Sequence, residues 1–153
     1  MKVRLLTLLF LAVPVVLAAG DFGTLQNAKY ITCYDGDTCR FNVPGVHPII
    51  GKNVSVRLDG IDTPEIKGKC SNEKELAKKA KVFLNQLFKN LKPGDRIDLT
   101  RLERGKYFRL VATIIIQSED GTTLNVNEQL IKNDLAVPYD GKAKTHSWCP
   151  SVN

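Results

Sequence analysis

The sequence predicts one domain of the α+β class, in which helices pack on a curved sheet of about five strands. Three observations support this prediction. Short segments of alternating apolar and polar residues follow residue 20, as expected for half-buried strands. One longer segment, 71–91, carries apolar residues three or four positions apart, as expected for an amphipathic helix. No internal repeat, low-complexity tract or long linker divides the chain.

The first two strands are expected on either side of a tight turn. Segments 28–34 and 38–43 flank Asp35-Gly36-Asp37, and an Asp-Gly turn between two such segments indicates a β-hairpin. The chain then passes through a loop rich in proline and glycine, residues 44–51.

A third strand is expected within residues 53–61. Val54, Val56 and Leu58 alternate with polar residues there, so one face of the strand is apolar. Arg57 belongs to the polar face and is therefore expected to point away from the core.

Helix 71–91 is expected to end at Lys92-Pro93-Gly94, since proline and glycine stop helices. Segments 95–103 and 110–117 again indicate strands, and residues 125–136 suggest a second, shorter helix. This pattern is compatible with an OB-type barrel. The apolar positions expected on the buried face of the first helix are Leu76, Ala80, Phe83, Leu84, Leu87 and Leu91.

Residues 1–19 have the layout of a secretory signal peptide. Lys2 and Arg4 precede an apolar run that starts at Leu5 and ends in small residues. We expect cleavage near Ala18, which leaves a monomeric domain over residues 20–153, secreted or periplasmic and without stable membrane association. A retained membrane anchor is the alternative, although the run is short for a bilayer span.

Charge and cysteine usage narrow the class of protein. The formal charge is +6, and two of the positive charges lie in the predicted signal peptide. This excess suits a polyanionic partner but equally suits solubility. Four cysteines in an exported chain indicate disulfides. The sequence contains no Cys-x-x-Cys pair, and its 2 histidines are not spaced as zinc ligands usually are. Both observations argue against a zinc site.

The stretch CYDGDTCRF, residues 33–41, has two interpretations. Asp35 and Asp37 are ordinary turn residues, but their carboxylates are also the oxygen ligands that Ca²⁺ prefers. The stretch is not an EF-hand, because Cys39 stands where that loop needs an oxygen ligand.

The stretch RLDGIDTPE, residues 57–65, favours the metal interpretation. It places Arg57, Asp62 and Glu65 at the end of a polar-faced strand and in the turn after it, which Pro64 stiffens. An acid for a metal, an acid for proton abstraction and a guanidinium for an oxyanion are the groups needed to hydrolyse a phosphodiester. A surface cluster of ion pairs is the alternative.

A third stretch, RGKYFRLVA, combines basic and aromatic residues ahead of a buried strand, a combination typical of nucleic-acid contacts. Taken in chain order, DGDT, RLDGIDTPE, KYFR and NEQLI resemble the staphylococcal nuclease (thermonuclease) family, over roughly residues 28–139. The resemblance implies a five-stranded OB-type β-barrel with two or three packed helices. The family's long C-terminal helix is missing, because the segment from Pro138 is short and rich in breakers.

The resemblance also implies a Ca²⁺-dependent endonuclease that hydrolyses DNA and RNA, with single-stranded or denatured substrate preferred, and leaves 3′-phosphate ends. Carried over residue by residue, the carboxylates of Asp37 and Asp62 and the backbone carbonyl of Thr63 would bind Ca²⁺. Asp35 would hold a water on the ion.

Glu65 would then act as general base, and Arg57 and Arg109 would grip the phosphate and stabilise the charge that develops on its oxygens. The same family pattern implies that Lys106 and Tyr107 contact substrate phosphate or base. Tyr139 is a further candidate substrate contact, as a residue that stacks on a nucleotide; a packing or capping tyrosine is the alternative.

The hairpin register predicts a disulfide between Cys33 and Cys39. Centred on Gly36, these residues face each other, and opposed residues in an antiparallel pair have Cα atoms about 4.5 or 5.5 Å apart. Both distances lie inside the disulfide range of about 4.4–6.8 Å. The pairing leaves Cys70 with Cys149. The alternative is that Cys33 or Cys39 is a free, buried apolar residue.

Two other classes of protein stay open at the level of sequence. A non-catalytic OB-type nucleic-acid-binding module would keep the basic and aromatic residues, but it would not need the acids and arginines together. A secreted structural or inhibitory protein would explain the cysteines, but not the acids in the turn.

Overall fold

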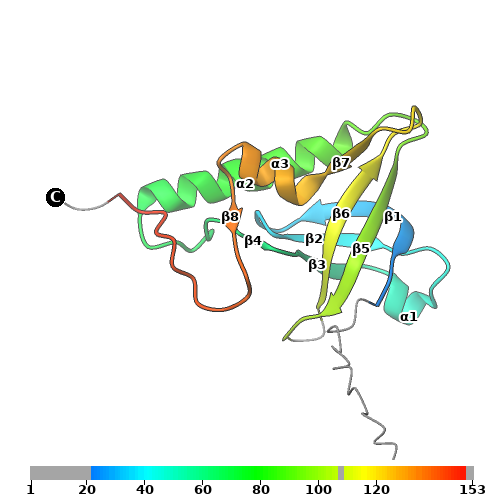
Figure 1. Cartoon of the computed structure of the whole chain (residues 1–153), viewed down its shortest axis with the longest axis horizontal. Coiled ribbons are helices and arrows are strands. Elements are labelled where there is room, and N and C mark those ends of the chain that lie inside the picture. The colour runs from blue at the N-terminus through cyan, green and yellow to red at the C-terminus, as the bar shows by residue number, and fades with distance from the viewer. Residues whose placement is uncertain (1–21, 107–108, 151–153) are drawn as a thin grey trace, which may run out of the picture.

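The computed structural model describes residues 22–106 and 109–150. The signal peptide predicted for residues 1–19 and the predicted contact residue Tyr107 lie outside them. Five strands close into a barrel because β3 pairs with β2 on one side and with β6 on the other (Figure 1). The barrel strands, in spatial order, are β3 (Val54–Leu58), β2 (Thr38–Asn42), β1 (Leu25–Cys33), β5 (Arg96–Arg104) and β6 (Leu110–Gln117).

These strands confirm the predicted barrel, and their burial follows the predicted alternation. Val56 and Leu58 are buried, whereas Arg57 between them is half-exposed. The hairpin of β1 and β2 has the expected register, with Cys33 opposite Cys39. Side-chain direction on these strands is therefore set by the period of two in the sequence.

Helix α2 (Ser71–Lys89) packs along the barrel, as predicted, and the predicted positions Ala80 and Leu84 are buried, but the centre of the buried stripe is shifted toward Ala77 and Phe88. Ala77 and Ala80 are fully buried, whereas Phe83 and Leu87 are only half-buried. Small residues at the contact allow the helix backbone to approach the hairpin closely, which rotates the larger side chains toward the edge of the interface. The carboxylate residue Glu73 also lies on the buried face.

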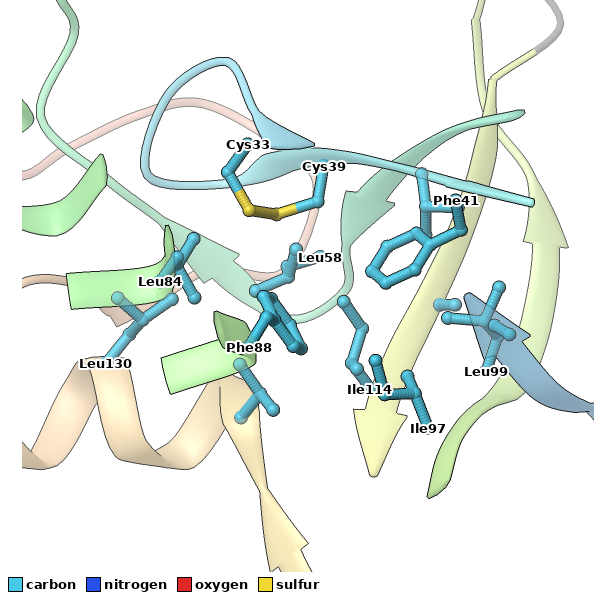
Figure 2. Close-up of a cluster of buried hydrophobic side chains, with 14 of the residues drawn as sticks. Cys33, Cys39, Phe41, Leu58, Leu84, Phe88, Ile97, Leu99, Ile114 and Leu130 are labelled. Carbon is cyan, nitrogen blue, oxygen red and sulfur yellow. A yellow bond between two sulfur atoms is a disulfide. The ribbon is translucent and has the colours of Figure 1, made fainter. Parts of the chain in front are cut away.

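The core lies between α2 and the inner faces of the barrel strands (Figure 2). The Cys33–Cys39 disulfide borders this core, and both cysteines are buried. Phe88 of α2 stacks on Tyr30 with ring centroids 4.8 Å apart and meets the edge of Phe41 at 5.7 Å. Aromatic packing thus fixes the far end of α2 against the first hairpin.

Four short elements were not expected from the sequence, because segments of two to four residues carry no detectable periodicity. They are α1 (Pro48–Gly51), in the expected loop, β7 (Thr123–Asn125), and the paired β4 (Ile61–Asp62) and β8 (Val137–Pro138). The predicted second helix is α3 (Val126–Lys132).

Helix α3 is tied to the barrel through Asn127, in the sequence NEQLI. Its side-chain amide donates to the Asp59 carbonyl at 2.7 Å, and its side-chain oxygen accepts from the Ile114 amide at 3.1 Å. This buried residue therefore links α3 to the turn between β3 and β4.

After β8 the chain crosses to the start of α2 as a segment that we name the C-terminal strap, residues 139–149 (Figure 1). Its end is bonded to Cys70 through Cys149, which confirms the second predicted disulfide. Within the described residues, no helix has the length and apolar character that crossing a membrane requires.

Candidate functional site

The Asp35-Gly36-Asp37 turn is held tightly against the rest of the barrel. The Asp35 carboxylate accepts the Asp37 amide at 3.1 Å, and the Asp37 carbonyl accepts the Leu58 amide of β3 at 2.8 Å. A Cβ added at Gly36 would lie 2.8 Å from Cβ of Ala80 and 3.0 Å from Cβ of Thr63. Glycine is therefore required here by close packing, and it brings the turn against the Thr63 segment.

The buried Asp37 carboxylate joins this turn to Arg57. It accepts from the Thr38 hydroxyl at 2.8 Å and is hydrogen-bonded and ion-paired to the Arg57 guanidinium. Burial raises the pKa of Asp37 above its ordinary value, the guanidinium opposes this rise, and the nearby Asp35 adds to it. The neighbouring guanidinium thus offsets only part of the cost of burying this carboxylate as an anion.

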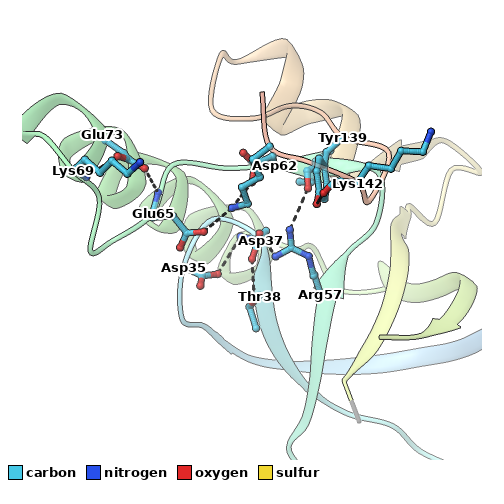
Figure 3. A network of polar contacts seen from close by, with 12 residues as sticks. Asp35, Asp37, Thr38, Arg57, Asp62, Glu65, Lys69, Glu73, Tyr139 and Lys142 are labelled. Atoms are coloured by element: carbon cyan, nitrogen blue, oxygen red, sulfur yellow. Dashed lines mark hydrogen bonds and ion pairs between the residues drawn. The ribbon is translucent and has the colours of Figure 1, made fainter. Parts of the chain in front are cut away.

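Asp62 and Thr63 are buried at the start of the next turn, whereas the Glu65 side chain is 58% exposed. This turn is fixed by Glu73, whose carboxylate accepts the Lys69 amide at 2.8 Å and the Glu65 amide at 3.3 Å. Figure 3 shows Glu73 to the left of Glu65, with Asp35, Asp37 and Arg57 to the right of it or below it. Sequence reasoning missed Glu73, because a single acid in a helix full of charged residues gives no sign of burial.

Lys144 of the C-terminal strap is the residue that sequence reasoning missed at the centre of the site. Its ammonium lies 2.7 Å from Asp62 Oδ1 and 2.7 Å from Glu65 Oε1. Burial alone would lower the pKa of Lys144, but the contacts with these two acids outweigh it and raise the pKa above its ordinary value. The predicted Cys70–Cys149 bond was the available signal, because it brings the strap's lysines to this turn.

The predicted site residues line two neighbouring cavities, with the predicted basic residues at one and predicted acidic residues at the other. A cavity of about 600 Å³ is lined by predicted phosphate and substrate contacts, namely Arg57, Lys106, Arg109 and Tyr139. A second cavity of about 350 Å³ is lined by Asp62, Thr63 and Glu65. Lys144 lines both cavities, and Arg57 reaches Asp37 from the first. The structure therefore brings the basic residues together beside the acids.

The predicted ligands suit a hard divalent cation in their chemistry. Asp37, Asp62 and the Thr63 carbonyl offer only oxygen atoms, and such atoms bind Ca²⁺. Asp62 Oδ1 is buried and accepts no hydrogen bond from any group in the described residues, so it has capacity for an ion. It meets Lys144 as an ion pair without hydrogen-bond geometry.

Among the described residues, the side chains of Asp35, Asp37, Asp62 and Glu65 do not form a group of three whose ligand atoms all lie within 4.8 Å of one another. In the described part of the chain, the group of three such side chains whose ligand atoms do lie within 4.8 Å of one another is Cys70, Glu73 and Cys149, but both of its sulfurs belong to a disulfide. Arg57 holds Asp37, and Lys144 holds Asp62. Cationic side chains thus neutralise the two predicted carboxylate ligands separately.

The fold and site define an α+β protein whose closed OB-type barrel carries acids and arginines where β2, β3 and β4 meet. A family model described as staphylococcal nuclease homologue matches residues 55–148, which include Arg57, Asp62, Glu65 and Arg109 but not the Asp35–Asp37 turn. The chain belongs to this family, whose members are generally nucleases or nucleic-acid-binding proteins and typically depend on a metal. A search of curated proteins found no match.

Proposed function

We propose that the chain is an exported Ca²⁺-dependent nuclease that hydrolyses the phosphodiester bonds of DNA and RNA and leaves 3′-phosphate ends. The observation that carries this proposal is the cavity lined by Arg57, Lys106 and Arg109 directly beside the one lined by Asp62 and Glu65. Such an arrangement can bind an anionic phosphate while keeping a carboxylate next to it.

The arginines supply positive charge where the transition state gains negative charge. Arg57 uses part of its guanidinium to contact Asp37, and its Nη2 lies 3.5 Å from the Ile61 carbonyl. A guanidinium has five N–H donors in a planar fork, so donors are left for phosphate oxygens in the cavity. Arg109 lines the same cavity and would contact the phosphate together with Arg57.

Glu65 is the proposed general base. Its carboxylate is 58% exposed, so water can reach it, and its backbone amide is fixed by Glu73. A carboxylate held beside the phosphate can take the proton from an attacking water. Asp37, Asp62 and the Thr63 carbonyl would hold the ion, with Asp35 supporting them, and a bound Ca²⁺ would offset negative charge on the phosphate.

Lys106 and Tyr139 are the remaining proposed substrate contacts within the described residues. Both line the arginine cavity, and Tyr139 is fixed by hydrogen bonds from its amide to the Gly60 carbonyl and from its hydroxyl to the Lys142 carbonyl. Tyr107 is proposed with them. A preference for single-stranded substrate is proposed as well, because a groove that combines basic and aromatic side chains suits a backbone with unpaired bases.

The test uses the protein without residues 1–19 and 5′-labelled single-stranded DNA and RNA of the same sequence. With Ca²⁺ we expect both strands to be shortened, and phosphatase treatment should slow the products in a gel by removing 3′-phosphates. If the protein retards either strand in a native gel but cleaves neither with Ca²⁺, Mg²⁺ or Mn²⁺, it is a binding module of the same family.

A further inference from the structure

The ammonium of Lys144 lies between the two acids that the proposed function assigns to metal binding and proton transfer. It is 2.7 Å from Asp62 Oδ1, with which it forms an ion pair, and it donates a hydrogen bond to Glu65 Oε1 at 2.7 Å. The Asp62 side chain is 4% exposed and that of Lys144 is 42% exposed. The contact is therefore made at the mouth of the buried part of the site.

The C-terminal strap that carries Lys144 is anchored at both ends. At the first end β8 pairs with β4, and the Tyr139 amide donates to the Gly60 carbonyl at 2.9 Å. At the second end Cys149 is bonded to Cys70, and the side-chain amide of Asn72 donates to the Trp148 carbonyl at 2.8 Å.

Lys144 stands midway between these anchors, five residues after Tyr139 and five before Cys149. Cys70 itself follows Glu65 by five residues, so the same disulfide restrains both the lysine and the acid that it contacts. A group tethered in this way acts at an effective concentration on the order of millimolar or above.

We propose that Lys144 is a built-in counter-cation of the Asp62–Glu65 pair, which a divalent ion must displace in order to bind, and that the Cys70–Cys149 bond holds it there. The proposal rests on the proposed function in one respect, namely that Asp62 is a metal ligand. Both cations need the same carboxylate oxygens, so they cannot be bound together at Asp62 Oδ1. A tethered occupant lowers the fraction of molecules ready to bind the ion, and the apparent dissociation constant rises in proportion.

Calorimetric titration of Ca²⁺ into the protein without nucleic acid tests the proposal independently of catalysis. Lys144→Gln should bind Ca²⁺ about tenfold more tightly than the unmodified protein, as expected if the lysine leaves the acids free in about one molecule in ten. Lys142→Gln is the matched control, because Lys142 lies in the same strap with its side chain 85% exposed and contacts Asp140 instead. It should leave the dissociation constant unchanged.

The double variant Cys70→Ser and Cys149→Ser tests the tether. It should also bind Ca²⁺ more tightly, and adding Lys144→Gln to it should have less effect than in the disulfide-bonded protein. Thermal unfolding of each variant verifies that it is folded.

Unchanged or weaker Ca²⁺ binding by Lys144→Gln, with clear binding by the unmodified protein, would overturn the proposal and leave the proposed function standing. If the disulfide variant binds like the unmodified protein while Lys144→Gln binds more tightly, the role of the bond is wrong. If neither the unmodified protein nor any variant binds Ca²⁺, both the counter-cation and the metal of the proposed function fail.

Discussion

The Arg57 guanidinium of β3 is hydrogen-bonded to the carboxylate of Asp37, the residue that immediately precedes β2. The two strands are paired in register, with Thr38 opposite Arg57, so the contact follows directly from the sheet. Arg57, the proposed phosphate contact, is thereby joined to Asp37, a proposed metal ligand. Replacing either residue should therefore affect both phosphate binding and metal binding.

Arg57→Lys should lower the rate of cleavage of single-stranded DNA by a factor on the order of 10²–10³, as removal of one transition-state donor does. A lysine keeps the charge but loses the planar fork that contacts a carboxylate and a phosphate at once. The measurement is the initial rate at saturating Ca²⁺, with circular dichroism to verify the fold. Arg40→Lys is the matched control, because Arg40 is an exposed arginine of β2 whose side chain donates a hydrogen bond to the Asn53 carbonyl, away from the proposed site residues. Near-normal turnover by Arg57→Lys would show that Arg57 does not contact the phosphate.

Glu65→Gln should lower the same rate by a factor on the order of 10²–10⁴, because an amide cannot accept the proton of the attacking water. Glu75→Gln, on the exposed face of α2, provides the comparison and should cleave at the normal rate. If Glu65→Gln keeps most of the activity, another group is the base.

Gly36→Ala should destabilise the protein by about 1–3 kcal/mol and weaken Ca²⁺ binding, because its Cβ would be forced to within 2.8 Å of Ala80 Cβ. The turn would have to move away from α2 and Thr63, and Asp37 would move with it. Urea denaturation measures the stability, and calorimetry measures the binding of Ca²⁺. Unchanged values in both would mean that the turn is not held by this contact.

The two disulfides should differ in what they stabilise. In the chain-entropy estimate, removing the Cys70–Cys149 bond, which joins residues 79 positions apart, lowers the free energy of unfolding by about 4–5 kcal/mol. Removing the Cys33–Cys39 bond, which joins residues 6 positions apart, lowers it by about 2 kcal/mol. Cys33→Ala with Cys39→Ala should nevertheless weaken Ca²⁺ binding, because that bond closes the Asp37 turn. Equal Ca²⁺ affinity after removal of Cys33–Cys39 would leave that bond a purely structural role.

Much of the barrel could be predicted because its causes are local. The alternation of Val56, Arg57 and Leu58 set the buried face of β3, and the symmetry about Gly36 set the hairpin register. This register also predicted the Cys33–Cys39 bond correctly, although the two Cα atoms are 3.9 Å apart, which is closer than expected. Tyr34 and Thr38 form the hydrogen-bonded pair, so the cysteines occupy the closer, non-hydrogen-bonded position.

The parts that could not be predicted depend on contacts distant in sequence. Ala77 and Phe88 are buried because the hairpin and Tyr30 approach α2, which the helix pattern alone does not encode. Lys144 reaches Glu65 across 79 residues, and Glu73 is buried by the turn that it caps. The roles assigned to the site residues, the export of the chain and the identity of the ion stay predictions.

The most direct test of the central claim is the initial rate at which the protein degrades heat-denatured DNA. The rate is measured with Ca²⁺, then after addition of a chelator, and again after Ca²⁺ is restored. Glu65→Gln, purified in the same way, excludes a contaminating enzyme. We predict rapid degradation that stops with the chelator, returns with Ca²⁺ and is largely absent in Glu65→Gln. Degradation that continues in the chelator, or that Glu65→Gln catalyses equally well, would contradict a metal-dependent nuclease site built on these residues.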